Sequence, residues 1–305
     1  METFASRLSN CICCPRACGV DRLAGELGVC GIGRDALVAH AGPHFGEEPP
    51  ISGTRGSGTI FFAGCNLRCV FCQNHQISQD FGRRDARGLT AAGLADEMLR
   101  LQDRGAHNVN FVSPSHVAAQ MADAVVAARG RGLAVPVVYN SNGYDAVDML
   151  RDLRGLVDVY LPDLKYLDAG LAARYSGAED YPEVVPGVLE EMLDQVGHLR
   201  VDDDGVATRG LLVRHLVLPG HLENSRRCLG LLAELSPDVF VSVMSQYSPQ
   251  HKACDHPGID RHLTAAEYRE IVDCALELGL ENAFLQELAS REHYLPDFGR
   301  DDPFG

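Results

Sequence analysis

The sequence predicts an α/β fold in which about six strands alternate with helices and form a parallel sheet, either open or closed into a barrel. From about residue 58 onward, short strand-like segments alternate with segments of helical periodicity. The strand segments are largely apolar, as in a parallel sheet that helices cover on its faces. The most reactive side chains follow directly after predicted strands, and active sites of barrels lie at these strand ends.

The predicted elements are short strands rich in β-branched and aromatic residues, with amphipathic helices between them. In the helix expected over residues 91–104, Leu94, Met98 and Leu101 share one face, and Thr90 is the predicted N-cap. Strands are expected at residues 58–63, 108–112, 135–139, 157–161, 211–218 and 239–244, and further helices at 117–129, near 144–153, near 184–199, at 224–235 and at 264–278.

Residues 1–50 differ from the rest of the chain. They are rich in Cys, Gly and Pro and show no sustained period of either a strand or a helix. We expect a small Cys-rich leader that binds a metal or an Fe–S cluster. One barrel domain is expected to follow over residues 51–305.

Composition and charge argue against two classes of partner. The net charge is −15, from 27 Lys and Arg against 42 Asp and Glu, so a nucleic acid would be repelled over most of the surface. No apolar run approaches the roughly 20 residues that span a bilayer. The first residues also lack the pattern of a signal peptide. We therefore expect a soluble, cytoplasmic protein without a membrane or nucleic-acid partner.

Eleven cysteines are present, and eight of them precede residue 73. Disulfide frameworks belong to small secreted domains, whereas clustered cysteines in a cytoplasmic protein indicate metal or cluster ligands. The three remaining cysteines, Cys228, Cys254 and Cys274, are isolated in the sequence, and we expect them to be buried and inert.

The most specific motif is Cys-x3-Cys-x2-Cys, formed by Cys65, Cys69 and Cys72 after the first predicted strand. Three thiolates on one loop can hold a cubane cluster and leave one iron open to another ligand. The alternative is zinc, but structural zinc sites use four ligands and zinc ribbons pair two Cys-x2-Cys knuckles. The motif therefore predicts a [4Fe–4S] cluster.

This spacing, with Phe71 before the third cysteine, resembles the signature of the radical S-adenosylmethionine (SAM) superfamily. The longer string over residues 64–74 resembles the pyruvate formate-lyase activating enzyme-like branch, as do Asn142-Gly143-Tyr144, Asp163-Leu164-Lys165, and Arg214 with Pro219-Gly220. The resemblance implies a partial (βα)6 TIM-type barrel and reductive cleavage of SAM to a 5′-deoxyadenosyl radical. It also implies an electron donor such as flavodoxin or ferredoxin.

The resemblance also implies roles for individual residues. Phe71 would pack near the adenine of SAM, Lys165 suits its carboxylate, and Asp163 suits its amino group. The alternative for Asp163 and Lys165 is a local surface ion pair of little energetic value. Asn142 would bind the ribose or the carboxylate, or be a simple turn residue. Arg214 would contact the cofactor or the substrate, or form a structural ion pair.

One segment departs from the family pattern. Activating enzymes of this type carry Gly-Gly-Glu after the second strand, where it holds the SAM amino group. Here residues 112–116 are Val-Ser-Pro-Ser-His. Ser113 and Ser115 are the candidates to replace part of this function, and His116 is expected to begin a helix.

A second set of thiols lies in the leader, where Cys11, Cys14, Cys18 and Cys30 are spaced as four ligands of one site. Four cysteines hold either zinc or a closed auxiliary Fe–S cluster, and the ligand set is the same for both. Cys13 is left over.

Two further segments are candidates for the edge of the site. The polar stretch of His40, His44, Glu47 and Glu48 is expected to form a loop over the barrel mouth. Gln246 and Tyr247 follow the sixth predicted strand and are expected to face the site or to pack in the core.

Three functions remain open. The first is a radical SAM enzyme that abstracts hydrogen from the glycyl loop of a partner glycyl radical enzyme, from another peptide or from a small molecule. The second is a non-catalytic interaction protein that binds zinc at both sets of cysteines. The third is an RNA-modifying radical enzyme, for which no basic face or added module is visible.

Overall fold

The computed structural model describes residues 4–80, 86–286, 295–300 and 302–304. Its centre is a sheet in the order β10-β9-β8-β6-β5-β4-β2-β1-β3, with β7 paired to β8. Every pairing from β2 to β10 along this path is parallel. The strands are β1 Ala36–His44, β2 Ser57–Phe62, β3 Arg87–Leu89, β4 Val109–Val112, β5 Val137–Asn140, β6 Val159–Tyr160, β7 Arg200–Val201, β8 Ala207–Leu216, β9 Phe240–Met244 and β10 Ala283–Leu285.

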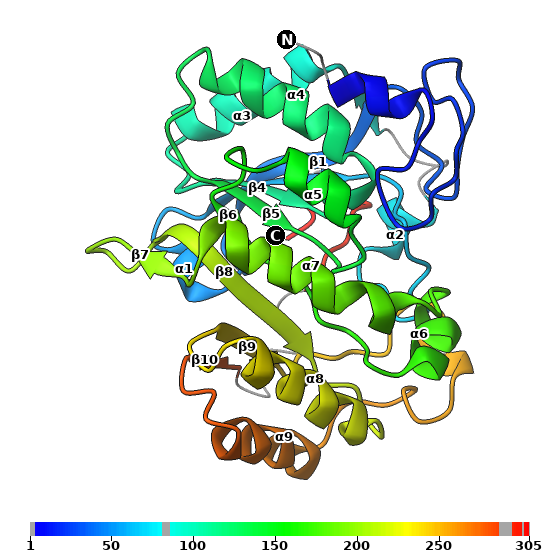
Figure 1. Ribbon diagram of the computed structural model, residues 1–305, viewed down its shortest axis with the longest axis vertical. Helices are drawn as coiled ribbons and strands as arrows, with labels where there is room; N and C mark the ends of the chain where they lie inside the picture. Colours follow the sequence, from blue (N-terminus) through cyan, green and yellow to red (C-terminus); the bar gives the residue numbers. More distant parts are fainter. Residues whose placement is uncertain (1–3, 81–85, 287–294, 301, 305) are drawn as a thin grey trace.

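Helices surround this sheet, as Figure 1 shows. Helix α3 presents Leu94, Met98 and Leu101 to the core, and the Thr90 side chain accepts a hydrogen bond from the amide of Gly93, which confirms the predicted N-cap. The helices are α1 Pro49–Ser52, α2 His75–Ser78, α3 Ala91–Asp103, α4 Ala118–Arg129, α5 Val147–Asp152, α6 Ala169–Ser176, α7 Tyr181–Val196, α8 Leu222–Leu235 and α9 Ala265–Glu277, with short 3-10 turns at Phe4–Leu8, Pro114–His116 and Ala253–Asp255.

The predicted fold class is confirmed. All six predicted strands occur, as β2, β4, β5, β6, β8 and β9, with their ends moved by a few residues. The sheet is open, with β10 at one end and β3 at the other, as in a partial barrel, and its parallel part runs from β2 to β10. Strand β10 is the unpredicted seventh parallel strand. It has three residues, too few for a strand pattern to emerge in the sequence.

The leader contributes a strand that the sequence pattern does not predict. Strand β1 pairs antiparallel with β2 on one side and with β3 on the other. A register shift between Val38 and His40 interrupts the alternation of buried residues, and Gly42 and Pro43 weaken it further. The expectation of a loop at His40 and His44 is therefore wrong, because both lie in β1. The domain boundary near residue 50 stays a prediction.

The parallel strands bring their carboxyl ends to one side of the sheet, and residues at or after each of these ends line one cavity. This arrangement collects side chains that are far apart in the sequence. Among the described residues, no helix combines the length and the apolar character needed to cross a membrane.

Candidate functional site

The cavity at the strand ends has a volume of about 220 Å³. Its lining includes nine of the residues predicted for the cluster and for SAM, all except Ser115: Cys65, Cys69, Cys72, Phe71, Ser113, Asn142, Asp163, Lys165 and Arg214. The fold therefore brings these nine side chains to one place. Their individual roles stay predictions.

The cysteine loop begins where β2 ends, at a glycine that the packing requires. Gly64 has φ +74°, and a Cβ there would lie 2.5 Å from the carbonyl oxygen of Cys30. Any other residue would push the loop away from the leader. The amides of Arg68 and Val70 donate to the carbonyls of Ser176 and Tyr175 on α6, which fixes the far side of the loop.

Each of the three thiols has a hydrogen-bond partner. The Leu67 amide lies 3.4 Å from Sγ of Cys65, and the hydroxyls of Ser176 and Ser78 lie 3.0 Å and 3.3 Å from Cys69 and Cys72. Burial and the neighbouring Cys69 raise the pKa of Cys65 to about 11 and that of Cys72 to about 12. Three thiolates this close are stable only beside a cation. The donor set therefore fits a positively charged cluster.

Asn142 links the turn after β5 to the cysteine loop. Its side-chain amide donates to Oδ1 of Asn66 at 2.8 Å and lies 3.5 Å from Sγ of Cys65. Gly143 follows with φ +76°, and a Cβ there would lie 2.6 Å from the hydroxyl of Tyr181. Asn142 is thus held by its contacts on both sides, and its contact with SAM stays a prediction.

A buried network of charges lies after β6 and on β8. Nζ of Lys165 is 2.7 Å from Oδ2 of Asp163, and the guanidinium of Arg214 is 2.9 Å from Oδ1 of the same carboxylate. Burial opposes ionisation of Asp163, but Arg214 and Lys165 hold its pKa below the usual value. The Lys165 pKa is raised because the negative charges of Asp163 and Cys69 outweigh its burial. The surface ion pair considered as an alternative is wrong, since both side chains are largely buried.

Two carboxylates from the leader complete this network. Oε1 of Glu47 accepts hydrogen bonds from the side-chain amides of Asn110 at 3.1 Å and Asn140 at 3.2 Å. Its Oε2 lies 3.3 Å from Nη1 of Arg214. Oε2 of Glu48 is buried and has no hydrogen-bond partner among the described residues. Burial raises the pKa of both carboxyl groups. An oxygen left unpaired in this cavity is a candidate to accept a hydrogen bond from a bound molecule.

The segment that departs from the family pattern contributes one residue to the cavity. Ser113 adopts φ +55°, donates its amide to the carbonyl of Asn140 at 2.8 Å and lines the cavity. Ser115 is buried, and the cavity lining does not include it. His116 ends the 3-10 turn and lies against the leader cysteines. Of the two serines considered, Ser113 is therefore the one placed to contact a ligand.

Aromatic side chains form another part of the cavity wall. The rings of Phe71 and Tyr247 are 5.8 Å apart at 63°, and Gln246 also lines the cavity, so the expectation that residues 246 and 247 face the site is met. Phe304 lies with its ring 4.2 Å from that of His44 and closes part of the cavity. No sequence pattern near Phe304 indicates this role, because the contact joins the two ends of the chain.

The leader cysteines surround a second, much smaller cavity. It is lined by Cys11, Cys13, Cys14, Cys18 and Cys30, together with Arg22 and His116. A Cβ on Gly28 would lie 2.8 Å from Sγ of Cys18, so glycine is needed for the loop to reach this thiol. The fold thus brings the four predicted ligands and Cys13 together. Among the isolated cysteines, burial is confirmed for Cys228 and is wrong for Cys254, which is exposed.

Arg22 is a buried cation of the leader site, with 1% of its surface exposed, and Arg16 lines the same cavity. Its Nη1 donates to the carbonyl of His116 at 2.9 Å and lies 3.6 Å from Sγ of Cys11. Its Nη2 has no hydrogen-bond partner in the described ranges of the chain. Hydrogen bonding from Cys13, together with the charge of Arg22, lowers the pKa of Cys11 to about 5 despite its burial. The positive charge of this buried guanidinium favours a negatively charged group at the leader cysteines.

Comparison of the sequence with known proteins supports the same interpretation of the cysteine loop and its cavity. The sequence model of the Radical SAM superfamily matches residues 59–195. The uncharacterized protein MJ0674 of Methanocaldococcus jannaschii is 31% identical over 288 residues, which cover 92% of this chain and 78% of that protein.

Solved structures share the fold at low sequence identity. Streptococcus suis SuiB matches with a TM-score of 0.50 and 14% identity over 75% of this chain and 49% of its own. HydG, a maturase of the [FeFe]-hydrogenase, matches with a TM-score of 0.52 and 11% identity over 75% of this chain and 51% of its own. The chain thus spans about half the length of these two proteins, and the likeness supports the fold alone.

The chain belongs to the radical SAM superfamily. Membership makes it an enzyme and implies a [4Fe–4S] cluster and SAM as cofactors. The residues present fit both groups, since one loop offers three thiols beside a cavity that carries buried charges and an aromatic ring.

Proposed function

We propose that this enzyme cleaves SAM at a cluster held by Cys65, Cys69 and Cys72 and uses the product to remove hydrogen from a substrate carbon. The observation that carries the proposal is that these thiols share one cavity with the buried Asp163–Lys165 pair. When bound and reduced by an electron donor, the cluster would supply the one electron that breaks a carbon–sulfur bond of SAM, and the products would be methionine and a 5′-deoxyadenosyl radical able to take a hydrogen atom.

The chain's own residues bind and orient SAM. Lys165 offers a buried ammonium to the carboxylate of SAM, and Asp163 offers an acceptor to its amino group. Arg214 keeps Asp163 ionised when Lys165 turns toward its ligand, because it holds the other carboxylate oxygen. Phe71 offers its ring to the adenine, and Ser113 and Asn142 offer hydrogen bonds to the ribose or the carboxylate.

The apolar part of the wall protects the reactive carbon. Leu67, Leu216, Met244 and Phe304 line the cavity and keep water away from the reacting groups. Phe71 and Tyr247 pack edge to face beside the cluster loop. This packing fixes the aromatic ring that is assigned to the adenine.

For the substrate, we favour the glycyl loop of a partner enzyme, with another peptide or a small molecule as the alternatives. The resemblance of residues 64–74 to the activating-enzyme branch supports the glycyl loop.

We also propose that the leader holds an auxiliary Fe–S cluster. Tetrahedral zinc would hold its four sulfur atoms about 3.8 Å apart. Within the described residues, no three of the leader thiols lie within 4.8 Å of one another. A cubane spreads its ligands further, because each thiolate binds a different iron. The buried Arg22 would offset part of the negative charge of four thiolates.

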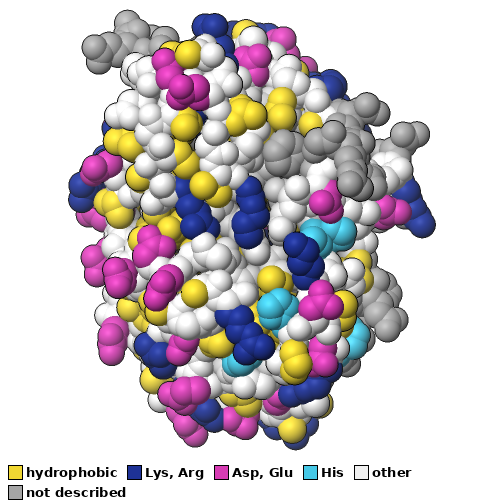
Figure 2. Space-filling model, turned by 90° about the vertical axis from the view of Figure 1, so that its right-hand side faces the viewer, with side chains coloured by type: hydrophobic (Ala, Val, Ile, Leu, Met, Phe, Trp, Pro, Cys, Tyr) yellow, Lys and Arg dark blue, Asp and Glu magenta, His cyan; other side chains and the backbone are white. Residues whose placement is uncertain are grey.

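The electron donor, such as a flavodoxin or ferredoxin, is proposed to dock over the cluster loop. Figure 2 shows basic and histidine side chains gathered toward the middle of the face that includes α2 and α6. Arg174 on α6 and Lys252 are exposed, and both adjoin the loop, since Val70 bonds to the backbone of Tyr175 and of Lys252. Positive side chains on an acidic protein suit an acidic donor.

The decisive experiment is anaerobic. The purified protein is reduced with dithionite, SAM is added, and 5′-deoxyadenosine, iron and zinc are measured together with a Cys69→Ala control. The proposal predicts deoxyadenosine that is lost in the control, and iron for two clusters. Iron for one cluster with one zinc would make the leader a zinc site. Absence of iron and of SAM cleavage would overturn the proposal in favour of a zinc-binding interaction protein.

A further inference from the structure

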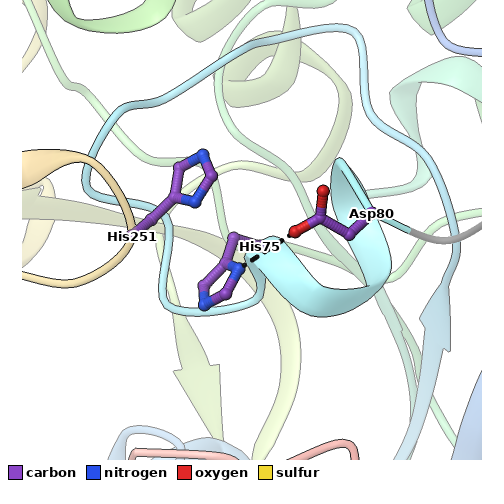
Figure 3. A group of neighbouring side chains, drawn as sticks. All are labelled: His75, Asp80 and His251. Atoms are coloured by element: carbon purple, nitrogen blue, oxygen red, sulfur yellow. Dashed lines mark hydrogen bonds and ion pairs between the residues drawn. The ribbon is translucent and has the colours of Figure 1, made fainter. Parts of the chain in front are cut away.

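A second group of ligand-type side chains lies on the outer side of the cluster loop. His75, Asp80 and His251 each offer one atom, and these three atoms all lie within 4.8 Å of one another (Figure 3). Within the described part of the chain, this is the one group of three or more His, Cys, Asp or Glu residues that meets so closely. It is separate from both sets of cysteines.

Two segments distant in the sequence build this group. His75 begins α2, three residues after Cys72, and Asp80 follows the end of the same helix. The amide of Asp80 donates to the carbonyl of His75 at 3.1 Å, which turns the carboxylate toward the imidazole. His251 comes from the loop after β9, and the neighbouring amide of Lys252 donates to Val70 at 2.8 Å. The backbone therefore holds both segments together without any metal.

The three side chains face one another without a strong hydrogen bond among them. Nδ1 of His75 lies 3.5 Å from Oδ2 of Asp80, too long for a strong hydrogen bond. The two imidazole rings stack at 4.7 Å and 18°, an arrangement that two protonated rings would not adopt. His251 has φ +55°, an unfavourable conformation for a residue with a Cβ.

His251 also carries an unsatisfied nitrogen. Its Nε2 is buried and has no hydrogen-bond partner among the residues that the structure describes. Asp80 supplies the third candidate ligand atom of the group.

We propose that His75, Asp80 and His251 bind one divalent first-row transition ion, with zinc as the probe. Two imidazoles and one carboxylate are a common ligand set for such ions and leave positions open to water. The exposed side chain of Asp80 gives the ion access from solvent. No covalent or redox step is assigned to this ion.

The position of the site suggests what the ion does. On the inner side of the same two segments, Gln73 and Asn74 and then Tyr247 and Ser248 line the active cavity. An ion across the outer side would join these two walls and resist their separation. The expected effect is a more stable cluster loop.

Calorimetric titration of the anaerobic holoprotein with zinc chloride tests the proposal, because the loaded clusters occupy the cysteines. Wild type is expected to bind one additional zinc. His75→Ala and His251→Ala should weaken this binding by more than about tenfold, and Asp80→Asn should also weaken it. The matched control is His256→Ala, a histidine of the same loop region whose ring instead packs on Tyr175.

Thermal unfolding gives a second measurement. Zinc should raise the Tm of wild type and of His256→Ala, and should leave the Tm of His251→Ala unchanged. An alanine variant could lose iron because its histidine lies beside the cluster loop. Asp80→Asn then serves as the test, because the Asp80 side chain is exposed and asparagine has nearly the same shape. The proposal is overturned if wild type binds no zinc beyond its clusters, or if the three variants bind it as wild type does.

Discussion

The side-chain nitrogen of Asn142 lies 3.5 Å from Sγ of Cys65, so a residue after β5 touches a thiol of the cysteine loop. Hydrogen bonds to the sulfur atoms of a cluster raise its reduction potential. If Cys65 holds the cluster as proposed, this contact would let Asn142 tune the reduction potential of the cluster in addition to its proposed contact with SAM.

The first prediction concerns this contact. Asn142→Ala removes a hydrogen bond toward a thiolate, and such bonds contribute about 1.5–3 kcal/mol. We expect a more negative cluster potential and about tenfold slower formation of deoxyadenosine. Redox titration followed by electron paramagnetic resonance measures the first, and product assay measures the second.

A remote asparagine supplies the control for this experiment. Asn282→Ala removes an exposed hydrogen bond to the carbonyl of Asp238 and should change neither quantity. An unchanged potential in Asn142→Ala, at normal iron content, would show that the contact with Cys65 has no electronic effect.

The second prediction concerns SAM binding by Lys165. Lys165→Met keeps much of the side-chain length and removes the ammonium. Asp163 remains paired with Arg214, so we expect normal folding and iron content. The dissociation constant for SAM, measured by equilibrium dialysis, should rise more than about tenfold because the carboxylate loses a charged partner.

Lys165→Arg provides the comparison, since it keeps the charge but not the geometry, and it should restore part of the affinity. Equal affinity in Lys165→Met and wild type would contradict the assignment and leave the lysine with a purely structural role.

Local chemistry made the central part of the site predictable. Cys65, Cys69 and Cys72 form a motif within one loop, and Asp163 and Lys165 follow a strand whose apolar pattern is clear. Parallel strands bring their carboxyl ends together, so residues after different strands were expected to meet. The strand pattern thus predicted that these residues lie close together, although it does not indicate which side chains touch.

The rest of the site depends on long-range pairing that no local pattern encodes. Glu47 and Glu48 reach the cavity because β1 pairs antiparallel with β2, and a register shift obscures β1 in the sequence. Phe304 reaches it by packing on His44 and Phe61 near the other end of the chain. Such contacts join segments with no shared periodicity, so composition and spacing do not indicate them.

The third prediction tests the turn that positions Asn142. At Gly143, φ is +76° and a Cβ would collide with the backbone of Asp163 and with Tyr181. At Gly155, φ is +80° and nothing lies within 4 Å of a Cβ. Both substitutions to alanine introduce the same backbone strain, about 1–2 kcal/mol.

Gly143→Ala alone adds the steric clash. We therefore expect a much larger fall in Tm for Gly143→Ala than for Gly155→Ala, together with loss of SAM cleavage. Similar Tm values for the two variants would mean that the turn relaxes to accept a side chain.

The fourth prediction separates electron delivery from chemistry. Arg174→Glu combined with Lys252→Glu reverses two charges beside the cluster loop. We expect slower SAM cleavage with a flavodoxin or ferredoxin as donor and an unchanged rate with dithionite, because a small reductant needs no docking surface. The rate with the protein donor should also depend less on salt in the variant.

Charge reversal at Arg227, exposed on α8, is the matched control and should leave both rates unchanged. A variant that is equally slow with dithionite would indicate damage to the cluster, and a variant as fast as wild type with both donors would place the docking surface elsewhere.

The last prediction is a pH dependence of stability that arises from His215. This residue is fully buried, and its ring nitrogens lie 2.7 Å from the carbonyl of Leu164 and 2.8 Å from the hydroxyl of Ser225. Burial lowers its pKa from 6.5 to about 4. The folded state therefore keeps the ring neutral, whereas the unfolded chain takes up a proton below pH 6.5. Because the unfolded state binds more protons in this window, stability falls as pH drops from about 6.5 toward 4.

Between pH 7 and pH 5.5, His215 alone should lower the free energy of unfolding by about 1 kcal/mol. Denaturant unfolding followed anaerobically by circular dichroism measures this change, and His215→Gln should reduce it by that amount because glutamine does not titrate. The variant will be less stable at pH 7, so the informative quantity is the slope with pH rather than the absolute value. An identical slope in wild type and variant would mean that His215 takes up its proton over the same pH range in the folded and unfolded chains, because the carbonyl of Leu164 and the charge of Asp163 offset its burial.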